Sequence, residues 1–417
     1  MKKIVINGNK VLSGTINISG AKNSVVALIP AAILTEEKVE ILNTPELTDT
    51  ENLRRIIEIL GGEIEFGKGH LKIDGRNVKS NLIPADLSDK LRASYYFMGA
   101  LLGRFKHVEI FFPGGCKIGK RPIDLHLKAF RKMGASITRD GDKYTLVAKN
   151  LHGANILLDF PSVGATINIL MAATLADGVT IIENAAKEPE IINIISLLNN
   201  MGAKIVGGGT TTIRIEGVQK LNGAVIEVIP DRIEAGTYMM IGALIGDNLK
   251  IANVIPQHVE ILLSKMRDMG VKFKIDDDSV TFYKSGNLEA IDIKTLVYPG
   301  FPTDLGQPMA VMLTQANGES KFVETIYENR GGHYPELNKM GANIEYTPTT
   351  ATIKGPTSLV GTEVAASDLR AGAALMIAGL IAEGTTKISN IEHILRGYED
   401  LVFKLSSVGA DIDIIDE

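Results

Sequence analysis

The chain has 417 residues, 45% hydrophobic and 22% charged, a composition typical of a globular protein of two or three domains. Its 44 Lys and Arg against 49 Asp and Glu give a net charge of −5, which argues against nucleic acid as a partner. One Cys excludes an internal disulfide, and seven scattered His argue against a metal site, so we expect no cofactor.

The amino-terminal residues do not form the pattern of a secretory signal. Met1-Lys2-Lys3 leads into a polar stretch at residues 7–10 and not into an apolar core. The longest apolar runs, such as residues 371–382, are about half the length that a membrane-spanning helix needs. The sequence therefore predicts a soluble, cytoplasmic protein without membrane insertion.

A short motif of Leu, Met or Val followed by Gly ends a helical pattern six times along the chain. The copies are Leu60-Gly61-Gly62, Met133-Gly134-Ala135, Met201-Gly202-Ala203, Met269-Gly270-Val271, Met340-Gly341-Ala342 and Val408-Gly409-Ala410. Their successive spacings are 73, 68, 68, 71 and 68 residues. Spacing this regular indicates six copies of one structural repeat.

Each repeat contains the same predicted elements in the same order. An apolar helix rich in small residues, such as residues 236–245, is expected to be buried on most sides. A short strand follows it, at 38–42, 107–111, 179–183, 249–253, 321–324 and 386–390. An amphipathic helix such as 51–60 is then ended by the Gly, which adopts the left-handed conformation easily. One or two alternating strands, as at 411–415, complete the repeat.

This pattern predicts an α/β protein whose helices face inward and whose strands lie outside. Three repeats sharing one core would give two domains, with a boundary near residues 228–231, so that residues 21–229 form the first and 230–417 the second. Residues 1–20 contain a strand-like segment that belongs to no complete repeat. We expect it to supply strands missing from the sixth repeat, and we expect the ligand site in a cleft between the domains.

Lys22 and Asn23 lie just before the first buried helix, after Ser19-Gly20-Ala21. Glycine allows the backbone to approach a ligand, and a helix N-terminus and a Lys both favour an anion. A helix-capping turn explains the same residues equally well, and both interpretations stay open.

Cys116 lies in residues 112–122, where three Gly and two Pro argue against a helix or central strand. A small hydrophobic core residue is the alternative, but such cysteines lie in apolar elements. The neighbouring Lys117, Lys120 and Arg121 would stabilise a thiolate and lower its pKa. The thiol could be a nucleophile or a proton donor, and spacing alone does not decide which.

Arginines occupy equivalent turns of several repeats. Arg92 and Arg370 precede the buried helices of the second and sixth repeats, while Arg121, Arg330 and Arg396 precede amphipathic helices. A single Arg is more often a surface residue than a ligand. Five in equivalent turns favour a pocket for carboxylate or phosphate, which the planar guanidinium binds by paired hydrogen bonds.

Asp304 follows Phe301-Pro302-Thr303, before the buried helix of the fifth repeat. Nearby positive charge would keep it ionised and available to take a proton from a substrate hydroxyl. The alternative is an N-cap for the helix that follows.

Four motifs carry a resemblance to a known family: residues 19–23, the loop at 113–126, Phe301-Pro302-Thr303-Asp304 and Arg396-Gly397-Tyr398-Glu399. Together they resemble the UDP-N-acetylglucosamine 1-carboxyvinyltransferases, the enolpyruvyl transferases that open peptidoglycan synthesis and so serve cell wall biogenesis, cell shape and division. The resemblance covers all six repeats. It implies a two-domain inside-out α/β barrel of six βαβαββ-like repeats, in which the amino-terminal strands complete the second domain.

The resemblance also implies that phosphoenolpyruvate and UDP-N-acetylglucosamine are converted to the enolpyruvyl ether and phosphate without a metal. Cys116 is then the general acid and the target of fosfomycin, Asp304 is the base, and Lys22 is catalytic. The implied phosphoenolpyruvate contacts are Lys22, Asn23, Arg121, Arg330, Arg370 and Arg396. The implied UDP-sugar contacts are Asn23, Arg92, Arg121, Pro122, Ile123, Asp124, Leu125, Ser162, Val163, Gly164, Asp304 and Ile326.

Three alternatives stay open. The shikimate-pathway enolpyruvyl transferase shares the six-repeat design but lacks this Cys loop and has Lys-Ser where this chain has Lys22-Asn23. A non-catalytic sugar-nucleotide-binding paralogue would be expected to have lost Cys116, Arg121 or Arg396, and all are present. A repeat scaffold that binds another protein predicts no charge bias in the turns.

Two positions depart from the family pattern. Gly331-Gly332 precedes His333 where the family often has Phe-Met, and Gly306 stands where Gln is more usual. We expect the first change to loosen the turn that carries Arg330, and the second lies beside Asp304.

Overall fold

The computed structural model describes residues 2–90, 92–111 and 123–416, and the chain divides into two compact lobes. The first lobe spans residues 20–229, and the second combines residues 2–19 with 230–416. Each lobe has its own hydrophobic core, one drawn from residues 21–228 and the other from residues 4–18 and 233–412.

Three sheets of the first lobe share one plan, in which a leading strand pairs in parallel with the next and the remaining pairs are antiparallel. The first contains β14 (Ala224–Glu227), β3 (Lys38–Leu42), β5 (His70–Asp74) and β4 (Glu63–Gly67). The second contains β6 (Leu82–Ile83), β7 (His107–Phe111), β9 (Lys143–Val147) and β8 (Ser136–Asp140). The third contains β10 (Asn155–Leu157), β11 (Val179–Glu183), β13 (Thr212–Glu216) and β12 (Lys204–Val206).

The second lobe repeats the plan with the amino-terminal strands included. Its first sheet contains β2 (Leu12–Asn17), β15 (Gly246–Ala252), β17 (Ser279–Phe282) and β16 (Phe273–Ile275). Its second contains β18 (Leu288–Glu289), β19 (Ile293–Lys294), β20 (Ala316–Val323), β22 (Thr350–Gly355) and β21 (Asn343–Tyr346). Its third contains β23 (Glu363–Ala365), β24 (Thr385–Ser389), β1 (Lys2–Asn7) and β25 (Asp411–Asp416).

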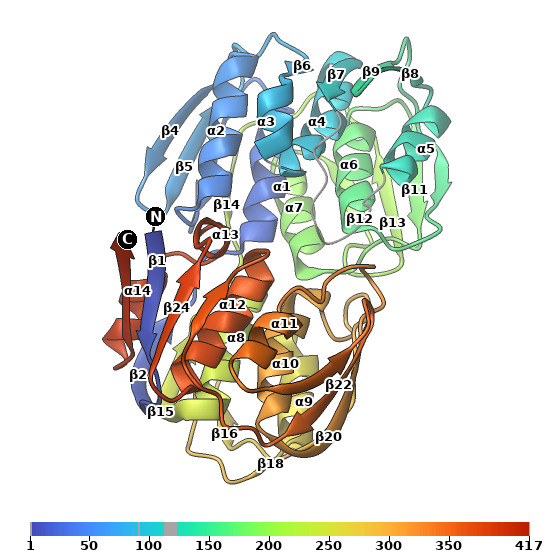
Figure 1. The fold of residues 1–417 in the computed structure, drawn as a ribbon. Coiled ribbons are helices and arrows are strands. Elements are labelled where there is room, and N and C mark those ends of the chain that lie inside the picture. Colours follow the sequence, from blue (N-terminus) through green and yellow to red (C-terminus); the bar gives the residue numbers. More distant parts are fainter. Residues whose placement is uncertain (1, 91, 112–122, 417) are drawn as a thin grey trace. The chain divides into compact units, whose positions relative to one another are not determined.

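The two amino-terminal strands join different sheets. β1 lies antiparallel between β24 and β25, with Ile6 opposite both Thr386 and Ile412, so it supplies the hairpin partner that the sixth repeat lacks (Figure 1). β2 instead pairs in parallel with β15 of the fourth repeat. The fourth repeat needs this strand because the residues before it, β14, pair with β3 of the first lobe.

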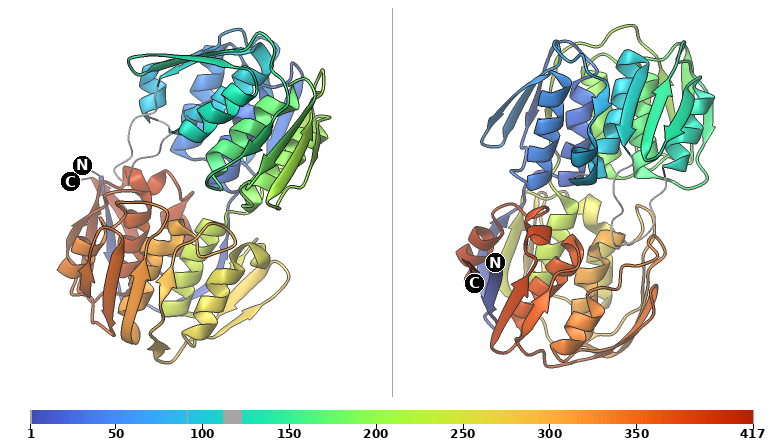
Figure 2. Two further views of the ribbon diagram at one scale, coloured as in Figure 1. Left: turned by 90° about the vertical axis from the view of Figure 1, so that its right-hand side faces the viewer. Right: turned by 45° about the horizontal axis from the view of Figure 1, so that its top comes forward.

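The small-residue helices form the interior of each lobe, and the sheets lie outside them (Figures 1 and 2). Almost all their residues are buried, which explains why they are apolar on every side. They are α1 (Lys22–Ala32), α4 (Tyr96–Phe105), α6 (Val163–Thr174), α8 (Arg232–Ile245), α10 (Gly306–Thr314) and α12 (Leu369–Ile381). The predicted α/β class and inside-out six-repeat design are confirmed.

The amphipathic helices alternate with these in the chain. They are α2 (Thr48–Leu60), α5 (Asp124–Lys132), α7 (Pro189–Asn200), α9 (Glu260–Asp268), α11 (Tyr334–Lys339) and α14 (Leu401–Ser407). Shorter segments are α3 (Ala85–Lys90), α13 (Glu392–Leu395), η1 (Arg92–Tyr95), η2 (Pro256–Val259) and η3 (Thr303–Leu305). Across the described ranges, no helix has the length and apolar character needed to cross a membrane.

The Gly of each repeat motif takes the left-handed conformation that its position after a helix predicts. The φ angles of Gly61, Gly134, Gly202, Gly270, Gly341 and Gly409 are 98°, 95°, 102°, 83°, 101° and 103°.

Gly270→Ala should lower the free energy of unfolding by about 1 kcal/mol, because an L side chain is strained at this φ. The added Cβ would have no atom within 4 Å, so the effect reports backbone strain alone. Gly286→Ala is the matched control, since that Cβ also meets nothing and its φ is not left-handed. Chemical denaturation of both variants checks this, and equal losses would contradict it.

Candidate active site

Asp304 lies in η3 and binds two buried arginines, one on each carboxylate oxygen. Arg330 Nη2 donates to Asp304 Oδ1 at 2.6 Å, and Arg370 Nη2 donates to Oδ2 at 3.1 Å. The two arginines are only 6% and 4% exposed, so the alternative interpretation, in which they are ordinary surface residues, is wrong for both. Asp304 does not cap α10, because the residue at that N-cap is Leu305 and no side chain bonds there.

The turns that carry the arginines are held together by their own hydrogen bonds. Arg370 lies in the first turn of α12, where Asp368 caps the helix by accepting from the amides of Arg370 and Ala371. Gln307 Nε2 donates to the Arg330 carbonyl at 3.1 Å and to Asp368 Oδ2 at 3.2 Å. The turn of Arg330 is therefore fixed to the start of α12 despite the glycines that follow it.

Burial disfavours the charged form of both arginines and by itself lowers their pKa, but Asp304 and the other neighbouring acidic and phenolic groups together outweigh this effect. The pKa of Arg330 and that of Arg370 both lie above the ordinary value. Both guanidinium groups therefore stay charged, and their planar donor groups suit the binding of an anion.

A chain of hydrogen bonds extends from Arg330 to Ile326. Arg330 Nη1 donates to Thr303 Oγ1 at 2.6 Å, and that hydroxyl donates to Glu324 Oε2 at 2.7 Å. Glu324 Oε1 accepts from the amide of Ile326 at 2.7 Å, and Glu324 is only 7% exposed. The sequence analysis missed Glu324, whose one signal is an acidic residue at the end of the fifth-repeat strand.

On the other side, Arg370 contacts the turn that carries Arg396. Arg370 Nη1 donates to the hydroxyl of Tyr398 at 3.3 Å, and this hydroxyl is 2.8 Å from Thr237 Oγ1. Burial raises the pKa of Tyr398 above its ordinary value, so the phenol stays neutral. Arg396 is half-buried and lies two residues before Tyr398. The structure therefore brings Asp304, Arg330, Arg370 and the turn of Arg396 together.

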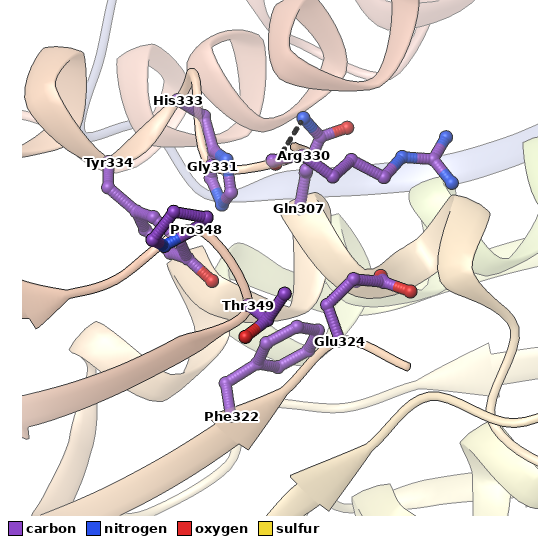
Figure 3. A pocket seen from close by; sticks show the side chains of 10 residues that line it. Gln307, Phe322, Glu324, Arg330, Gly331, His333, Tyr334, Pro348 and Thr349 are labelled. Atoms are coloured by element: carbon purple, nitrogen blue, oxygen red, sulfur yellow. Dashed lines mark hydrogen bonds between the residues drawn. The ribbon is translucent and has the colours of Figure 1, made fainter. Parts of the chain in front are cut away.

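A small cavity lies behind Arg330, lined by residues including Gln307, Phe322 and His333 (Figure 3). Its volume of about 10 Å³ holds roughly one water molecule. The glycines that depart from the family pattern are tightly packed here. A Cβ on Gly306 would lie 2.7 Å from the Phe322 ring, and one on Gly332 would lie 2.5 Å from Ser367 Oγ.

Burial lowers the pKa of His333 to about 3, from 6.5 in an ordinary environment. The unfolded chain therefore binds a proton below pH 6.5 that the folded protein excludes, and stability falls as the pH falls. Between pH 7.5 and pH 5.5 this residue should reduce the free energy of unfolding by about 1.4 kcal/mol. Denaturation at both pH values should show a smaller loss for His333→Phe. An identical loss in both proteins would be inconsistent with a neutral His333.

In the first lobe, Lys22 begins α1 and pairs with a carboxylate that sequence analysis did not single out. Lys22 Nζ lies 2.9 Å from Asp49 Oδ2, and the Asp49 side chain is 3% exposed. The N-cap residue of α1 is Ala21, without a side-chain bond, so Lys22 takes no part in a capping interaction. A Cβ on Gly20 would lie 1.9 Å from the Asn43 carbonyl oxygen, which is why glycine is required there. Asn23 follows in the first turn and is half-buried.

Three predicted UDP-sugar segments meet around Tyr95, the last residue of η1. A Cβ on Gly164 would lie 2.6 Å from the Tyr95 hydroxyl, and the His126 ring meets the Tyr95 ring edge-on at 5.3 Å. Ser162 caps α6 by accepting from the Ala165 amide at 3.2 Å. The predicted residues in these segments are Arg92, Ile123, Asp124, Leu125, Ser162, Val163 and Gly164. Tyr95 was missed by sequence analysis because aromatic residues in helices usually belong to the core.

Cys116, Arg121 and Pro122 lie outside the described residues. Among the side chains that the structure describes, no group of three or more His, Asp or Glu is arranged to hold a metal ion.

A family model described as EPSP synthase (3-phosphoshikimate 1-carboxyvinyltransferase) matches residues 6–405. UDP-N-acetylglucosamine 1-carboxyvinyltransferase 2 of Streptococcus thermophilus is 51% identical over 420 residues, covering 100% of both chains. The protein of the same name from Bacillus subtilis is 52% identical over 413 residues, covering 99% of this chain and 96% of that one. The chain belongs to the UDP-N-acetylglucosamine 1-carboxyvinyltransferases.

Solved structures agree with this carboxyvinyltransferase assignment at the level of the fold. The enolpyruvyl transferase NikO from Streptomyces tendae superposes with a TM-score of 0.90 at 26% identity, over 99% of both chains. EPSP synthase from Acinetobacter baumannii gives a TM-score of 0.75 at 19% identity, over 100% of both chains. The predicted family, and the α/β six-repeat fold that the resemblance implied, are confirmed.

Proposed function

We propose that the protein transfers the enolpyruvyl group of phosphoenolpyruvate to the 3-hydroxyl of UDP-N-acetylglucosamine and releases phosphate. The observation that carries this proposal is the sequence identity of 51% and 52%, over nearly the full length, to two carboxyvinyltransferases whose names include that sugar nucleotide. The EPSP synthase structure, at 19% identity, supports a common fold only.

The cationic residues suit phosphoenolpyruvate, which carries a phosphate and a carboxylate. In this proposal they are Lys22, Arg121, Arg330, Arg370 and Arg396, together with Asn23. Arg330 and Arg370 are buried, so their charges are weakly screened by water and act strongly on an anion. Protein cations then supply the positive charge that the phosphate and carboxylate require.

Asp304 is proposed as the base that takes the proton of the sugar 3-hydroxyl. Each of its oxygens accepts a hydrogen bond from a guanidinium group. A phosphoenolpyruvate carboxylate that accepts from one of these arginines would compete with Asp304 for that donor. Substrate binding would thereby make an oxygen of Asp304 available to the sugar hydroxyl when it is needed.

Cys116 is proposed as the acid. Its thiol gives a proton to the methylene carbon of phosphoenolpyruvate, and the sugar oxygen bonds to the adjacent carbon as Asp304 takes its proton. The resulting tetrahedral ketal then loses a proton from its new methyl group while the carbon–phosphate oxygen bond breaks. The Cys116 thiolate takes back that methyl proton, and Asp304 passes the sugar proton to the leaving phosphate, so both residues regain their starting state. The products are the enolpyruvyl ether and inorganic phosphate.

The UDP-sugar is proposed to contact the segments around Tyr95, along with Asn23, Asp304 and Ile326. Cys116, Arg121 and Pro122 complete the proposed set. Both substrates are multiply charged and do not cross membranes unaided, so we propose that the enzyme works in the cytoplasm. The location of the site between the two domains stays a prediction.

Phosphate release from phosphoenolpyruvate tests the function. We expect release only when UDP-N-acetylglucosamine is also present. Turnover with shikimate 3-phosphate in its place would identify the rival transferase. Binding of the sugar nucleotide without phosphate release would identify a non-catalytic relative.

A further inference from the structure

Four polar side chains form a second cluster in the second lobe, just after β2. Lys404 Nζ donates to Ser19 Oγ at 2.6 Å and to Glu234 Oε1 at 2.7 Å. Ser19 Oγ in turn donates to Glu399 Oε2. We call Ser19, Glu234, Glu399 and Lys404 the Ser19 cluster.

Every polar atom of Ser19 forms a hydrogen bond, either with another member of the cluster or with the residue before α8. Its amide donates to Glu234 Oε2 at 2.8 Å, and its carbonyl accepts from the Asp231 amide at 2.9 Å. The side chains of Glu234 and Lys404 are 2% and 13% exposed. A buried ion pair loses so much hydration that it is weak evidence for a purely stabilising role. The hydrogen bonds of the cluster instead hold the backbone of Ser19 in one position.

The cluster lies close in sequence to two cationic residues that are proposed to bind phosphoenolpyruvate, Lys22 and Arg396. Ser19 is the last residue of the second lobe before the chain enters the first, and Lys22 follows three residues later. Gly20 lies between them and packs directly against the Asn43 carbonyl of the first lobe. At the other end, Glu399 lies three residues after Arg396 in the same turn.

We infer that the Ser19 cluster is a positioning device for phosphoenolpyruvate, which fixes both the segment leading into Lys22 and the turn carrying Arg396. The inference rests on the proposed function, since that function assigns the two cations to this substrate. Small displacements of a binding group cause large losses when several groups must converge on one ligand. Most of the proposed UDP-sugar contacts lie around Tyr95 or in other segments, and only Asn23 lies in the segment that follows Ser19. Binding of the sugar nucleotide should therefore be little affected.

Steady-state kinetics of Ser19→Ala provides the first test, because this change removes only the hydroxyl. We expect the KM for phosphoenolpyruvate to rise about tenfold while the KM for UDP-N-acetylglucosamine stays within about twofold. Ser19→Thr keeps a hydroxyl and should restore most of the affinity. Ser320→Ala is the matched control, because Ser320 Oγ accepts a hydrogen bond from the Ile291 amide in the same lobe. Loss of this hydroxyl should leave both KM values unchanged.

Amide hydrogen exchange on the ligand-free protein provides the second test and needs no turnover. Lys404→Met should speed exchange in residues 19–25, where the chain enters the first lobe, and in residues 392–400 of the second lobe, relative to the remaining described residues. Uniformly faster exchange throughout the lobe, no change in either segment, or equal rises in both KM values would overturn the inference. An inactive wild-type protein would refute the proposed function and leave the exchange result to decide the role of the cluster.

Discussion

Asp304→Asn is expected to lower kcat by about 10²- to 10⁴-fold, the usual contribution of a general acid or base. Asn keeps the shape of the side chain but cannot accept the proton of the sugar hydroxyl. Binding of UDP-N-acetylglucosamine should weaken far less than turnover. Steady-state kinetics combined with calorimetric titration of the sugar nucleotide separates the two effects. A large loss of binding with nearly normal kcat would make Asp304 a binding residue.

The same substitution should also reduce the free energy of unfolding by about 2 kcal/mol. It removes the negative charge that neutralises Arg330 and Arg370, both buried, although partial exposure of Asp304 moderates the cost. Glu51→Gln is the matched control, because Glu51 also accepts two hydrogen bonds from one Arg, but on the surface of α2. That pair should contribute less than about 0.5 kcal/mol, and its loss should leave kcat unchanged.

Cys116→Ser should lower turnover by about 10²- to 10⁴-fold, because a hydroxyl is a much weaker acid than a thiol. Cys116→Asp should keep substantial activity, since a carboxylic acid also donates a proton. Phosphate release by both variants measures the effect. Inactivity of a folded Cys116→Asp variant would instead indicate that the thiol is an obligatory nucleophile.

Fosfomycin gives an independent measurement of the same residue. Cys116 is the only thiol of the chain, so the wild-type protein should gain the mass of one inhibitor molecule. Both Cys116 variants should gain none. Addition of the inhibitor to Cys116→Ser would place its target elsewhere.

The fold could be predicted far into its details because the repeat motif sets helix ends. The strands β3, β7 and β11 have the predicted bounds, and each motif Gly has the expected backbone conformation. Sequence analysis did not predict that β1 and β2 join different sheets. Pairing between strands distant in sequence depends on which edges are left open, and periodicity does not carry that information.

The candidate site was predictable only where residue type and position already indicated chemistry. Asp304, Arg330 and Arg370 were identified by their turns, and the structure joins them directly. Glu324 and Asp49 were missed because an acidic residue near a strand or helix end is usually a surface residue. Only tertiary packing shows that these two are buried against Thr303 and Lys22.

The position of β1 bears on how the chain folds during synthesis. Lys2 pairs with Asp416, so β1 cannot meet its partner β25 until the whole of the second lobe has been translated. The first lobe contains all its strands once residue 229 has emerged, and it can fold while translation continues. The second lobe cannot complete its third sheet until β25 has emerged, and until then residues 2–17 need protection from mispairing and aggregation.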